Sequence, residues 1–422
     1  MHSVTNAIPT GTIASIPAKA HAHRALICAA LANSPSTILL SRTSKDIDAT
    51  MDSLRGLGAH VVYENKVVTV TPGPVPAKGN VVPHESGTTL RLLLPVAASI
   101  CNDVDVDAKG RLPDRPLEPM LGEMKAHGVT FSQDKPPFTM TGRLQGGNFS
   151  MVGDVSSQFF SGLLLAAPQI GLSTITSTTP LQSSDYVTLT TETMRDFGVE
   201  VEHTLPDTNI NEAFTVPFGA SFNGRDHYQI EGDWSNAAIW MVAAGMTGKP
   251  ITITGMNKNS VQADRRIMQV MIDAGCDVVW DGMNITVTGR ASKPIHADLE
   301  QMPDMLPVMA ALACSISGES SFIKGARLRL KESDRLIAVA NLVRDLGGTV
   351  REDGDDLYII GSGILKGGHG DCVNDHRLVM AGTLMALISE NPVTLKDSEA
   401  ITKSYPDFFE DWNLLGGDAH GI

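Results

Sequence analysis

Cysteine is scarce in this chain, with five residues, an odd number, and no C-x-x-C pair. This scarcity argues against a disulfide framework and against a zinc ribbon, and it is typical of reduced thiols in a cytoplasm. Basic residues are also few, 33 against 47 acidic ones, which gives a formal net charge of -14. A field of that sign repels nucleic acid and anionic membranes. We therefore expect neither as a partner, and an anionic substrate would need a local basic cleft.

Long apolar runs are missing as well, because none approaches the roughly 20 residues that span a bilayer. The first residues have neither the charged nor the apolar region of a signal peptide. Hydrophobic residues make up 42% and charged residues 19% of the 422 positions, as in compact globular proteins. A chain of this length exceeds a single typical core. We expect a cytoplasmic protein of about two or three domains.

What the sequence does contain is an internal repeat. A short phrase recurs as LRGLGAHVV, MKAHGVTF, MRDFGVEVE, MIDAGCDVV, VRDLGGTV and, more weakly, WNLLGGD. The glycines of these phrases are Gly58, Gly128, Gly198, Gly275, Gly347 and Gly416. Their successive separations are 70, 70, 77, 72 and 69 residues. Such even spacing predicts six structural units of about 70 residues.

Each unit contains two helix candidates and several strands. The phrase itself is an amphipathic helix with a C-terminal glycine, usually followed by a strand. The second candidate is apolar nearly all round, which predicts burial; it occurs at Ala25–Ala32, Leu90–Ala98, Phe159–Ala167, Ala237–Ala244, Met305–Ala313 and Leu378–Ile388. Strand-like runs follow at Thr37–Leu40, Asp103–Asp107, Ser173–Thr176, Pro250–Thr254, Ser320–Ile323 and Val393–Leu395. Six α/β units exceed one core, so we expect two lobes of three, divided near Gln229–Asp233.

Polar and charged residues collect at two places in the units. The first is the start of the buried helix, at Lys19–Arg24, Glu85–Arg91, Ser156–Gln158, Asp233–Asn236, Met302–Asp304 and Asp375–Arg377. The second is the approach to the amphipathic helix, at Arg111–Arg115, Ser183–Tyr186, Lys331–Arg335 and Lys403–Tyr405. Free N–H groups and the helix dipole make helix N-termini suitable for phosphates and carboxylates. Several of them together would form an anion site despite the acidic total.

Each of these features also has a purely structural interpretation. Ser156 and Ser157 could be N-caps of a buried helix. The string Lys331–Arg335 could be a solvated charge run. His21 and His23 form an H-x-H pair, which without further ligands usually binds no metal. None of these motifs identifies a function by itself.

Taken together, the segments resemble the enolpyruvyl transferase family from end to end, in the branch that acts on shikimate 3-phosphate. The matching stretches are AKAHAHRALICAALA, ESGTTLRLLLPVAA, GRLPDRPLEPM, GDVSSQFFSGLLLAAP, SSDYVTLTTETMRDFGV, EGDWSNAAIWMVAA, PDMLPVMAALA, RLKESDRL, DHRLVMAGTLMAL and KSYPDFFEDW. The resemblance implies a two-lobed, inside-out α/β barrel-like fold, each lobe built from three βαβαββ repeats and closing on substrate. It places residues 1–16 and 232–422 in a lobe on the phosphoenolpyruvate side, and 17–231 in a lobe on the shikimate 3-phosphate side.

The same resemblance implies a reaction and a set of site residues. The enolpyruvyl group of phosphoenolpyruvate passes to the 5-hydroxyl of shikimate 3-phosphate, and phosphate leaves through a tetrahedral intermediate, in chorismate biosynthesis. Lys19 is expected between the anionic groups of both substrates. Shikimate 3-phosphate would be held by Lys19, Arg24, Ser156, Ser157, Ser183, Asp304 and Lys331. Phosphoenolpyruvate would be held by Lys19, Gly87, Arg111, Gln158, Arg335, Arg377 and Lys403.

Two carboxylates are the proton-transfer candidates by this likeness. We expect Asp304 to take the proton of the attacking hydroxyl and Glu332 to help protonate the methylene carbon. Lys331 and Arg335 would hold Glu332 toward its ionised form, so which residue is the acid stays open. Because arginine and lysine supply the electrostatic stabilisation, we expect no metal and no organic cofactor. We also expect a monomer.

The chain departs from the family pattern at several positions. The usual S-K-S motif is Ala18-Lys19-Ala20 here, and Ala20 replaces a serine that in the family bonds shikimate 3-phosphate. Loss of one such contact costs about 1.5–3 kcal/mol. Glu85 and Arg327 stand where relatives have asparagine.

Two alternatives therefore stay open. The first is a relative that binds a phosphorylated ligand without turning it over. The second is the branch of the family that uses UDP-N-acetylglucosamine as acceptor. That branch places a reactive cysteine just before its R-P pair, and residues 109–115 contain none.

Overall fold

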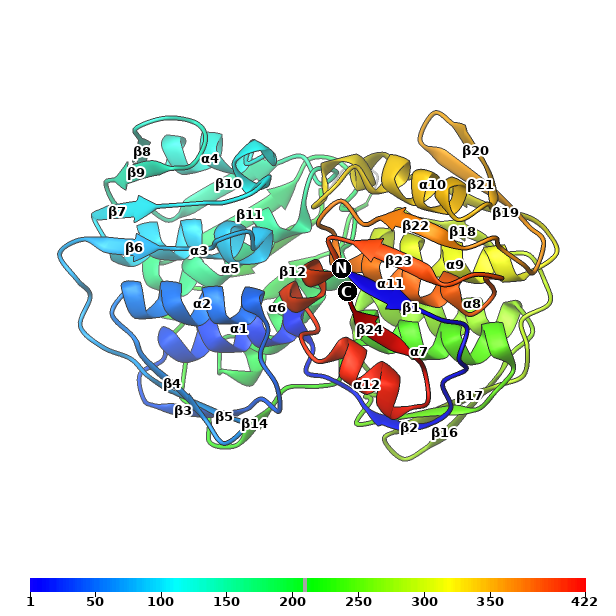
Figure 1. Ribbon diagram of the computed structural model, residues 1–422. Coiled ribbons are helices and arrows are strands. Elements are labelled where there is room, and N and C mark those ends of the chain that lie inside the picture. Colours follow the sequence, from blue (N-terminus) through cyan, green and yellow to red (C-terminus); the bar gives the residue numbers. More distant parts are fainter. Residues whose placement is uncertain (208–210) are drawn as a thin grey trace. The chain divides into compact units, whose positions relative to one another are not determined.

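The computed structural model describes residues 1–207 and 211–422 (Figure 1). The described chain divides into two compact units. The C-terminal unit consists of Met1–Ile16 with Glu231–Ile422, and the N-terminal unit consists of Pro17–Ile230. The chain thus passes from one unit to the other twice, after Ile16 and after Ile230.

The described part of the N-terminal unit holds three four-stranded sheets, ordered β14-β3-β5-β4, β6-β7-β9-β8 and β10-β11-β13-β12. Their strands are β3 (Ser36–Leu39), β4 (His60–Glu64), β5 (Val67–Thr71), β6 (Gly79–Val81), β7 (Asp103–Val106), β8 (Thr130–Phe131), β9 (Phe138–Thr141), β10 (Gly147–Met151), β11 (Ser173–Ser177), β12 (Glu202–Thr204), β13 (Ala213–Val216) and β14 (Tyr228–Gln229). The helices are α1 (Lys19–Ala30), α2 (Lys45–Gly56), α3 (Gly87–Ile100), η1 (Leu112–Asp114), α4 (Met120–Ala126), α5 (Ser157–Ile170) and α6 (Asp185–Asp196).

The C-terminal unit repeats this plan with sheets β16-β17-β15-β2, β18-β19-β21-β20 and β22-β23-β1-β24. Its strands are β1 (His2–Val4), β2 (Gly11–Ala14), β15 (Ile251–Thr254), β16 (Asp277–Asp281), β17 (Asn284–Thr288), β18 (His296–Asp298), β19 (Gly318–Ile323), β20 (Thr349–Asp353), β21 (Asp356–Gly361), β22 (Gly368–Asp371), β23 (Val393–Lys396) and β24 (Ala419–Gly421). Its helices are α7 (Trp234–Thr247), η2 (Ala263–Arg266), α8 (Ile267–Asp273), η3 (Pro303–Met305), α9 (Leu306–Ser315), η4 (Ala326–Leu330), α10 (Arg335–Asp345), α11 (His376–Ala386), η5 (Ser398–Lys403) and α12 (Phe408–Leu414).

All the described sheets share one pairing pattern, a parallel pair extended by two antiparallel strands. In the β10-β11-β13-β12 sheet, Phe149 pairs with Ile175 and Ile175 pairs with Phe214. All three side chains are buried. Because side chains alternate between the faces of a strand, this register directs one face of the sheet to the core.

Three of these sheets are completed by strands from the first residues of the chain and from the end of the N-terminal unit. β1 lies between β23 and β24, and β2 pairs in parallel with β15. In the N-terminal unit, β14 returns to pair in parallel with β3. The first residues of the chain therefore belong to the C-terminal unit because they supply strands that its own repeats lack.

The six repeat glycines end six helices in the same way. Each has a positive φ, between 87° and 103°. At the first, Gly58 N donates to Arg55 O at 3.0 Å and Ala59 N donates to Leu54 O at 3.0 Å. These bonds form a Schellman motif, which requires the left-handed conformation that glycine adopts at low cost. The recurring phrase is thus the end of α2, α4, α6, α8, α10 and α12.

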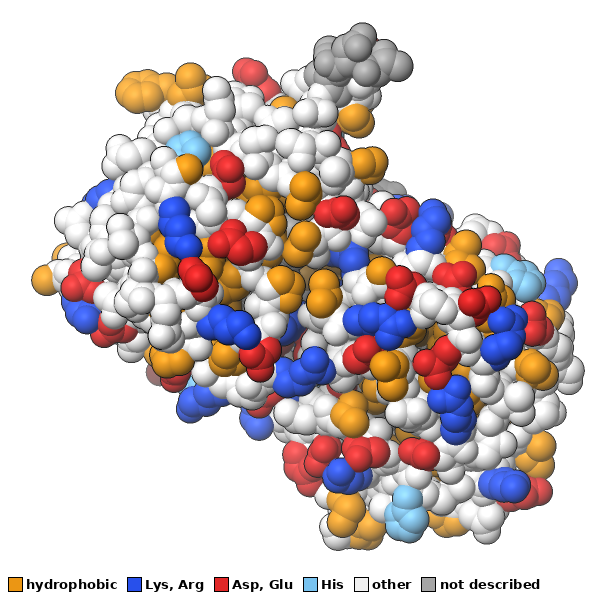
Figure 2. All heavy atoms as spheres, turned by 90° about the horizontal axis from the view of Figure 1, so that it is seen from above, with side chains coloured by type: hydrophobic (Ala, Val, Ile, Leu, Met, Phe, Trp, Pro, Cys, Tyr) orange, Lys and Arg blue, Asp and Glu red, His pale blue; other side chains and the backbone are white. Residues whose placement is uncertain are grey.

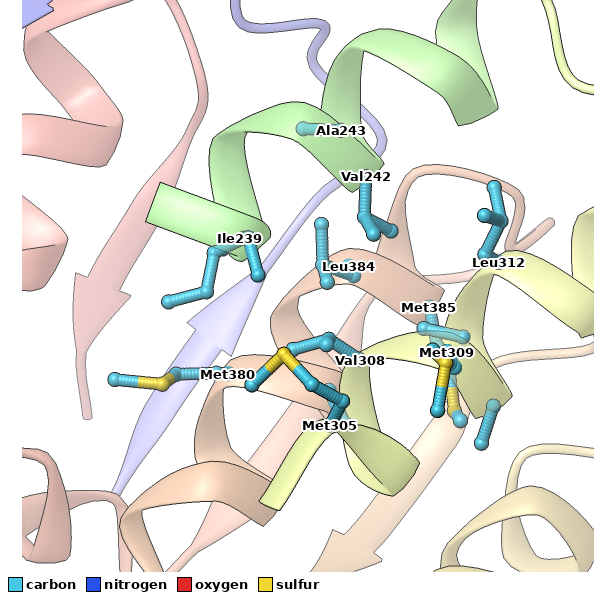
Figure 3. Packing of buried hydrophobic residues seen from close by; sticks show 14 of the residues in the cluster. Ile239, Val242, Ala243, Met305, Val308, Met309, Leu312, Met380, Leu384 and Met385 are labelled. Atoms are coloured by element: carbon cyan, nitrogen blue, oxygen red, sulfur yellow. The ribbon is translucent and has the colours of Figure 1, made fainter. Parts of the chain in front are cut away.

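The predicted buried helices form the interior of each unit. In the C-terminal unit, α7, α9 and α11 pack together through residues such as Ile239, Val308, Leu312 and Leu384 (Figure 3). Each of these side chains is at most 1% exposed. The prediction of burial from the missing polar face is confirmed. Charged residues such as Asp375 and Arg377 lie at the start of such a helix, where a site can form.

Charged side chains of both signs are interspersed on the face seen in Figure 2, so the net negative charge is not gathered into one block there. Every helix among the described residues is too short or too polar to cross a membrane.

Candidate functional site

Arg335 is the centre of a charged cluster in the C-terminal unit. It is the first residue of α10, and only 1% of its side chain is exposed. Its Nη1 donates to Asp304 Oδ1 at 2.6 Å, its Nη2 to Glu332 Oε2 at 2.7 Å and its Nε to Asp375 Oδ2 at 2.8 Å. One buried cation therefore holds three carboxylates from three segments of the chain. The alternative interpretation of Lys331–Arg335 as a solvated charge run is wrong, because Arg335 is buried.

Asp375 joins the starts of two helices. It is the N-cap of α11 and accepts from Arg377 N at 3.0 Å. It also accepts from Ser333 Oγ at 2.9 Å, just before α10. Capping and ion pairing by one carboxylate fix the starts of α10 and α11 together. Sequence reasoning missed Asp375 as a site residue, although it begins the D-H-R motif.

Asp304 lies in η3, directly before the buried helix α9. Its carboxylate is 3.1 Å from Lys331 Nζ, 2.6 Å from Arg335 Nη1 and 3.6 Å from Arg377 Nη2. Burial by itself raises the pKa of Asp304, but these three cations outweigh it and hold the pKa well below its usual range. Burial also lowers the pKa of Lys331, which the Asp304 charge partly counters. Asp304 is consequently an ionised carboxylate at neutral pH.

Lys403 completes the group of predicted residues in this unit. It ends η5 and its Nζ donates to Asn374 O at 2.7 Å, immediately before the cap of α11. The structure therefore brings together five of the site residues that were predicted for this part of the chain, Asp304, Lys331, Glu332, Arg335 and Arg377. Lys403 bonds to the backbone directly before the Asp375 cap.

In the N-terminal unit, two predicted cations differ in their surroundings. Lys19 is the first residue of α1, and its Nζ lies 2.7 Å from Asp46 Oδ2. Arg24 is 1% exposed, and burial lowers its pKa to about 10. Its guanidinium donates to Ala20 O, Tyr186 O, Ser161 Oγ and Thr190 Oγ1 at 2.7–3.2 Å. Arg24 thus ties α1 to α5 and α6 from inside the unit.

The start of α5 combines a cap with a bridging amide. Ser156 is the N-cap and accepts from Gln158 N at 3.3 Å, which confirms its structural interpretation. Ser157 is buried beside it. The Gln158 side chain accepts from Arg91 Nη1 at 3.1 Å and donates to Thr88 Oγ1 at 2.9 Å, so α5 is fixed to the start of α3. The predicted polar residues of these two helix starts are therefore adjacent.

Arg115 is the residue of this unit that sequence reasoning missed. A Cβ added at Gly87 would lie 2.7 Å from Arg115 Nη1, so the guanidinium lies directly over that glycine. Arg111, the predicted arginine, is exposed at the start of η1. The signal for Arg115 was the R-P pair within the segment GRLPDRPLEPM. The role of Arg111 stays a prediction.

Ser183 lies in the turn before α6. It is buried and has a φ of 53°, which is rare outside glycine. Tyr186 N donates to its carbonyl at 3.1 Å, and Tyr186 O in turn accepts from Arg24. Arg24 thus bonds to the turn that Ser183 begins, and the role of Ser183 stays a prediction.

These observations define a class of protein. Cations and carboxylates gathered at helix starts within each unit suit the binding of small anions, as the resemblance to a transferase of phosphorylated substrates leads us to expect.

Comparisons with known proteins identify the particular family. The family model of EPSP synthase (3-phosphoshikimate 1-carboxyvinyltransferase) matches residues 7–412. A 3-phosphoshikimate 1-carboxyvinyltransferase of Clostridium kluyveri is 36% identical over 97% of this chain and 95% of its own length. The enzyme of the same name from Methanocorpusculum labreanum is 34% identical, over 97% of each chain. The chain belongs to the EPSP synthase family. The prediction that it is a transferase of the 3-phosphoshikimate 1-carboxyvinyltransferase type is confirmed.

A solved structure supports the fold independently. EPSP synthase from Acinetobacter baumannii superposes with a TM-score of 0.82 at 22% identity, covering 100% of this chain and 99% of that one. The predicted two-lobed α/β fold of repeated units is confirmed.

Proposed function

We propose that this chain transfers the enolpyruvyl group of phosphoenolpyruvate to the 5-hydroxyl of shikimate 3-phosphate. The observation that carries the proposal is the Asp304 carboxylate, held among Lys331, Arg335 and Arg377 at 2.6–3.6 Å. This cluster offers a proton acceptor beside cations that suit carboxylate and phosphate groups. The sequence relatives described above bear the name of this reaction.

The C-terminal unit supplies three of the groups that hold phosphoenolpyruvate in this proposal. Arg335, Arg377 and Lys403 hold the anionic groups of phosphoenolpyruvate, and Lys331 contacts shikimate 3-phosphate. Arginine suits the planar carboxylate because its N–H groups match the two oxygens. The Arg335 side chain is fixed before substrate arrives by its ion pair with Asp375, whose cap also fixes the backbone of Arg377. Such preorganisation is what makes electrostatic stabilisation effective.

The N-terminal unit supplies groups for both substrates. Ser156, Ser157, Ser183 and Arg24 serve shikimate 3-phosphate, with Arg24 also organising the helices that carry the serines. Gly87, Gln158 and Arg111 serve phosphoenolpyruvate, and Lys19 serves both substrates. We add Arg115 to the phosphoenolpyruvate set, because its guanidinium covers Gly87.

The proton transfers divide between two carboxylates. The hydroxyl oxygen bonds to C2 of phosphoenolpyruvate while Asp304 takes the hydroxyl proton and C3 gains a proton. Phosphate then leaves with the C2–O bond electrons as C3 returns a proton to the Glu332 carboxylate, which restores the C2–C3 double bond. Asp304 is ionised at neutral pH because its pKa is held well below its usual range, so its carboxylate has a lone pair for the hydroxyl proton, and we assign it the role of acceptor. Glu332 is then the residue that assists protonation at C3.

Three further statements belong to this proposal. The chain acts as a monomer, in the cytoplasm, and without metal or organic cofactor. The five cysteines are buried thiols without disulfides, as a reducing compartment allows. Arginine and lysine side chains supply the positive charge that a metal would otherwise bring.

The test is phosphate release by the purified protein with both substrates, and with each omitted in turn. Release that requires both, with the enolpyruvyl product confirmed by mass, supports the proposal. Binding of shikimate 3-phosphate by calorimetry without release would instead indicate a non-catalytic relative. Release with UDP-N-acetylglucosamine in place of shikimate 3-phosphate would indicate the other acceptor.

A further inference from the structure

A second buried carboxylate, Asp264, lies beside Arg377. It belongs to η2, is 1% exposed, and accepts a hydrogen bond from Ser235 Oγ on α7. Its Oδ2 is 4.0 Å from Arg377 Nη2. Its Oδ1 is buried and meets no hydrogen-bond donor within residues 1–207 and 211–422. A buried carboxylate with one unsatisfied oxygen is costly, so its retention calls for a reason.

The geometry around Arg377 supplies that reason. The same Nη2 lies 3.6 Å from Asp304 Oδ2 and 4.0 Å from Asp264 Oδ2. Both distances exceed those of a hydrogen bond, so each carboxylate attracts this nitrogen through charge. Arg377 therefore lies between two competing anions that come from different segments, η2 and η3.

We propose that Asp264 is a positioning residue that draws Arg377 away from Asp304. With this pull, Arg377 stays available for an anionic substrate and Asp304 stays available as the proton acceptor. Without it, Arg377 would close onto Asp304 and occupy both groups. The assignment rests on the proposed function, because it concerns the site for phosphoenolpyruvate.

The charged neighbours of Asp264 determine when this pull operates. Arg377 faces it from α11, Asp304 from η3 and Asp233 from the cap of α7. On its own element it is followed by Arg265 and Arg266. Burial raises the pKa of Asp264 to about 6, which outweighs the opposing effect of Arg377. The carboxylate gains a proton as the pH falls through about 6, and its pull on Arg377 then ends.

The test is the Asp264→Asn variant, which keeps the shape and removes the charge. The measured quantity is the wild-type to variant ratio of kcat/KM for phosphoenolpyruvate between pH 5 and 8. Substrate ionisation affects both proteins equally and cancels in this ratio. We expect a ratio of about 10 to 100 above pH 7, falling toward one as the pH approaches 5. The KM for shikimate 3-phosphate should change little.

A ratio that is constant across this pH range would overturn the proposal, whether it is large or close to one. The matched control is Asp411→Asn, another buried carboxylate of the same unit, whose hydrogen bond comes from Tyr405 Oη. Its ratio should remain near one at every pH. Ser235→Ala offers a second variant in case Asp264→Asn fails to fold. Loss of the Ser235 hydroxyl raises the pKa of Asp264. In Ser235→Ala, kcat/KM for phosphoenolpyruvate should therefore begin to fall at a higher pH than in the wild type. A fall at the same pH would contradict the assignment.

A measurement without substrate separates this assignment from the proposed function. Because the folded pKa is raised from 3.8 to about 6, the folded state binds more protons than the unfolded state between these values. Wild-type stability should therefore fall, relative to Asp264→Asn, as the pH rises through this window. Parallel stability curves for the wild type and Asp264→Asn would show that Asp264 does not titrate in this window, and would overturn the assignment. Absent phosphate release from the wild type, with the stability curves diverging as expected, would instead reject the proposed function.

Discussion

Arg335 Nη1 donates a hydrogen bond to Asp304 Oδ1 at 2.6 Å. A predicted ligand of phosphoenolpyruvate is thus bonded to the predicted proton acceptor within one unit. The same contact contributes to holding the pKa of Asp304 below its usual range. Binding and proton transfer are therefore coupled at this pair, and their mutational effects should not be additive.

Replacing Arg335 by lysine should destabilise the C-terminal unit. Lysine keeps the charge, but it cannot reach Asp304, Glu332 and Asp375 together as the guanidinium does. A carboxylate left buried without its partner costs about 3–5 kcal/mol, measured as the free energy of unfolding in urea. The control is Arg344→Lys on the same helix, where a half-exposed pair with Glu352 predicts a change of at most about 1 kcal/mol. Equal losses in both variants would show that the Arg335 network is not specific.

Replacing Asp304 by alanine should lower turnover far more than substrate binding. Removal of a general base costs about 10²- to 10⁴-fold in kcat, whereas shikimate 3-phosphate keeps its other contacts. The measurements are kcat and the Kd for shikimate 3-phosphate by calorimetry. Asp304→Asn, which retains the volume, separates lost basicity from lost packing and should be equally slow. A rate unchanged by either substitution would remove Asp304 from the mechanism.

Replacing Gly87 by alanine should displace Arg115. The new Cβ would lie 2.7 Å from Arg115 Nη1, and the end of a flexible side chain can move at little cost in stability. We expect the KM for phosphoenolpyruvate to rise by about tenfold or more. Gly421→Ala is the control, because a Cβ there meets nothing within 4 Å.

A double-mutant cycle tests the cause of this Gly87 effect. If displacement of Arg115 is responsible, Gly87→Ala should have little further effect in an Arg115→Ala background. Additive effects of the two substitutions would show that Gly87 acts independently of Arg115.

The sequence predicted the repeats because they depend on local rules. Gly58 and its five counterparts adopt positive φ at helix ends, and the helices without a polar face are buried. The site was less predictable, because Asp375 and Arg335 are 40 residues apart and Asp264 meets Arg377 across two elements. Periodicity carries no information on such pairs. Family likeness selected Arg24 and Arg335 as substrate ligands, but it did not reveal that both are buried and extensively hydrogen-bonded.

Replacing Ala20 by serine should tighten shikimate 3-phosphate binding. His21 and His23 do not substitute for the missing hydroxyl in this structure, because His21 Nε2 lies 2.8 Å from Tyr228 Oη and His23 Nδ1 lies 2.7 Å from Thr50 Oγ1. A restored charge-assisted hydrogen bond is worth a decrease in KM of roughly 10- to 100-fold. Ala18→Ser, at a fully buried position, is the control and should leave the KM unchanged. An unchanged KM in Ala20→Ser would show that the site no longer uses this position.

Replacing His21 by glutamine should remove part of the acid sensitivity of the N-terminal unit. Tyr228 Oη donates to Asp196 Oδ2 at 2.9 Å, so it accepts from His21, whose Nε2 therefore carries the proton of a neutral ring. Burial lowers the pKa of His21 from 6.5 to about 4, despite the nearby Asp196 charge. Between these values the unfolded chain binds more protons than the folded one, so stability is lost as the pH falls from about 6.5 toward 4. The loss amounts to about 3 kcal/mol.

The measurement is the free energy of unfolding by urea between pH 4 and 7.5, for wild type, His21→Gln and His60→Gln. Glutamine keeps an N–H donor for Tyr228 but does not titrate, so its curve should be flatter than that of the wild type. His60 is exposed in the same unit, and its variant should follow the wild type. If the stability curve of His21→Gln ran parallel to that of the wild type as well, the titration of His21 would not contribute to the acid sensitivity. Acid destabilisation of this unit would then have to come from other groups.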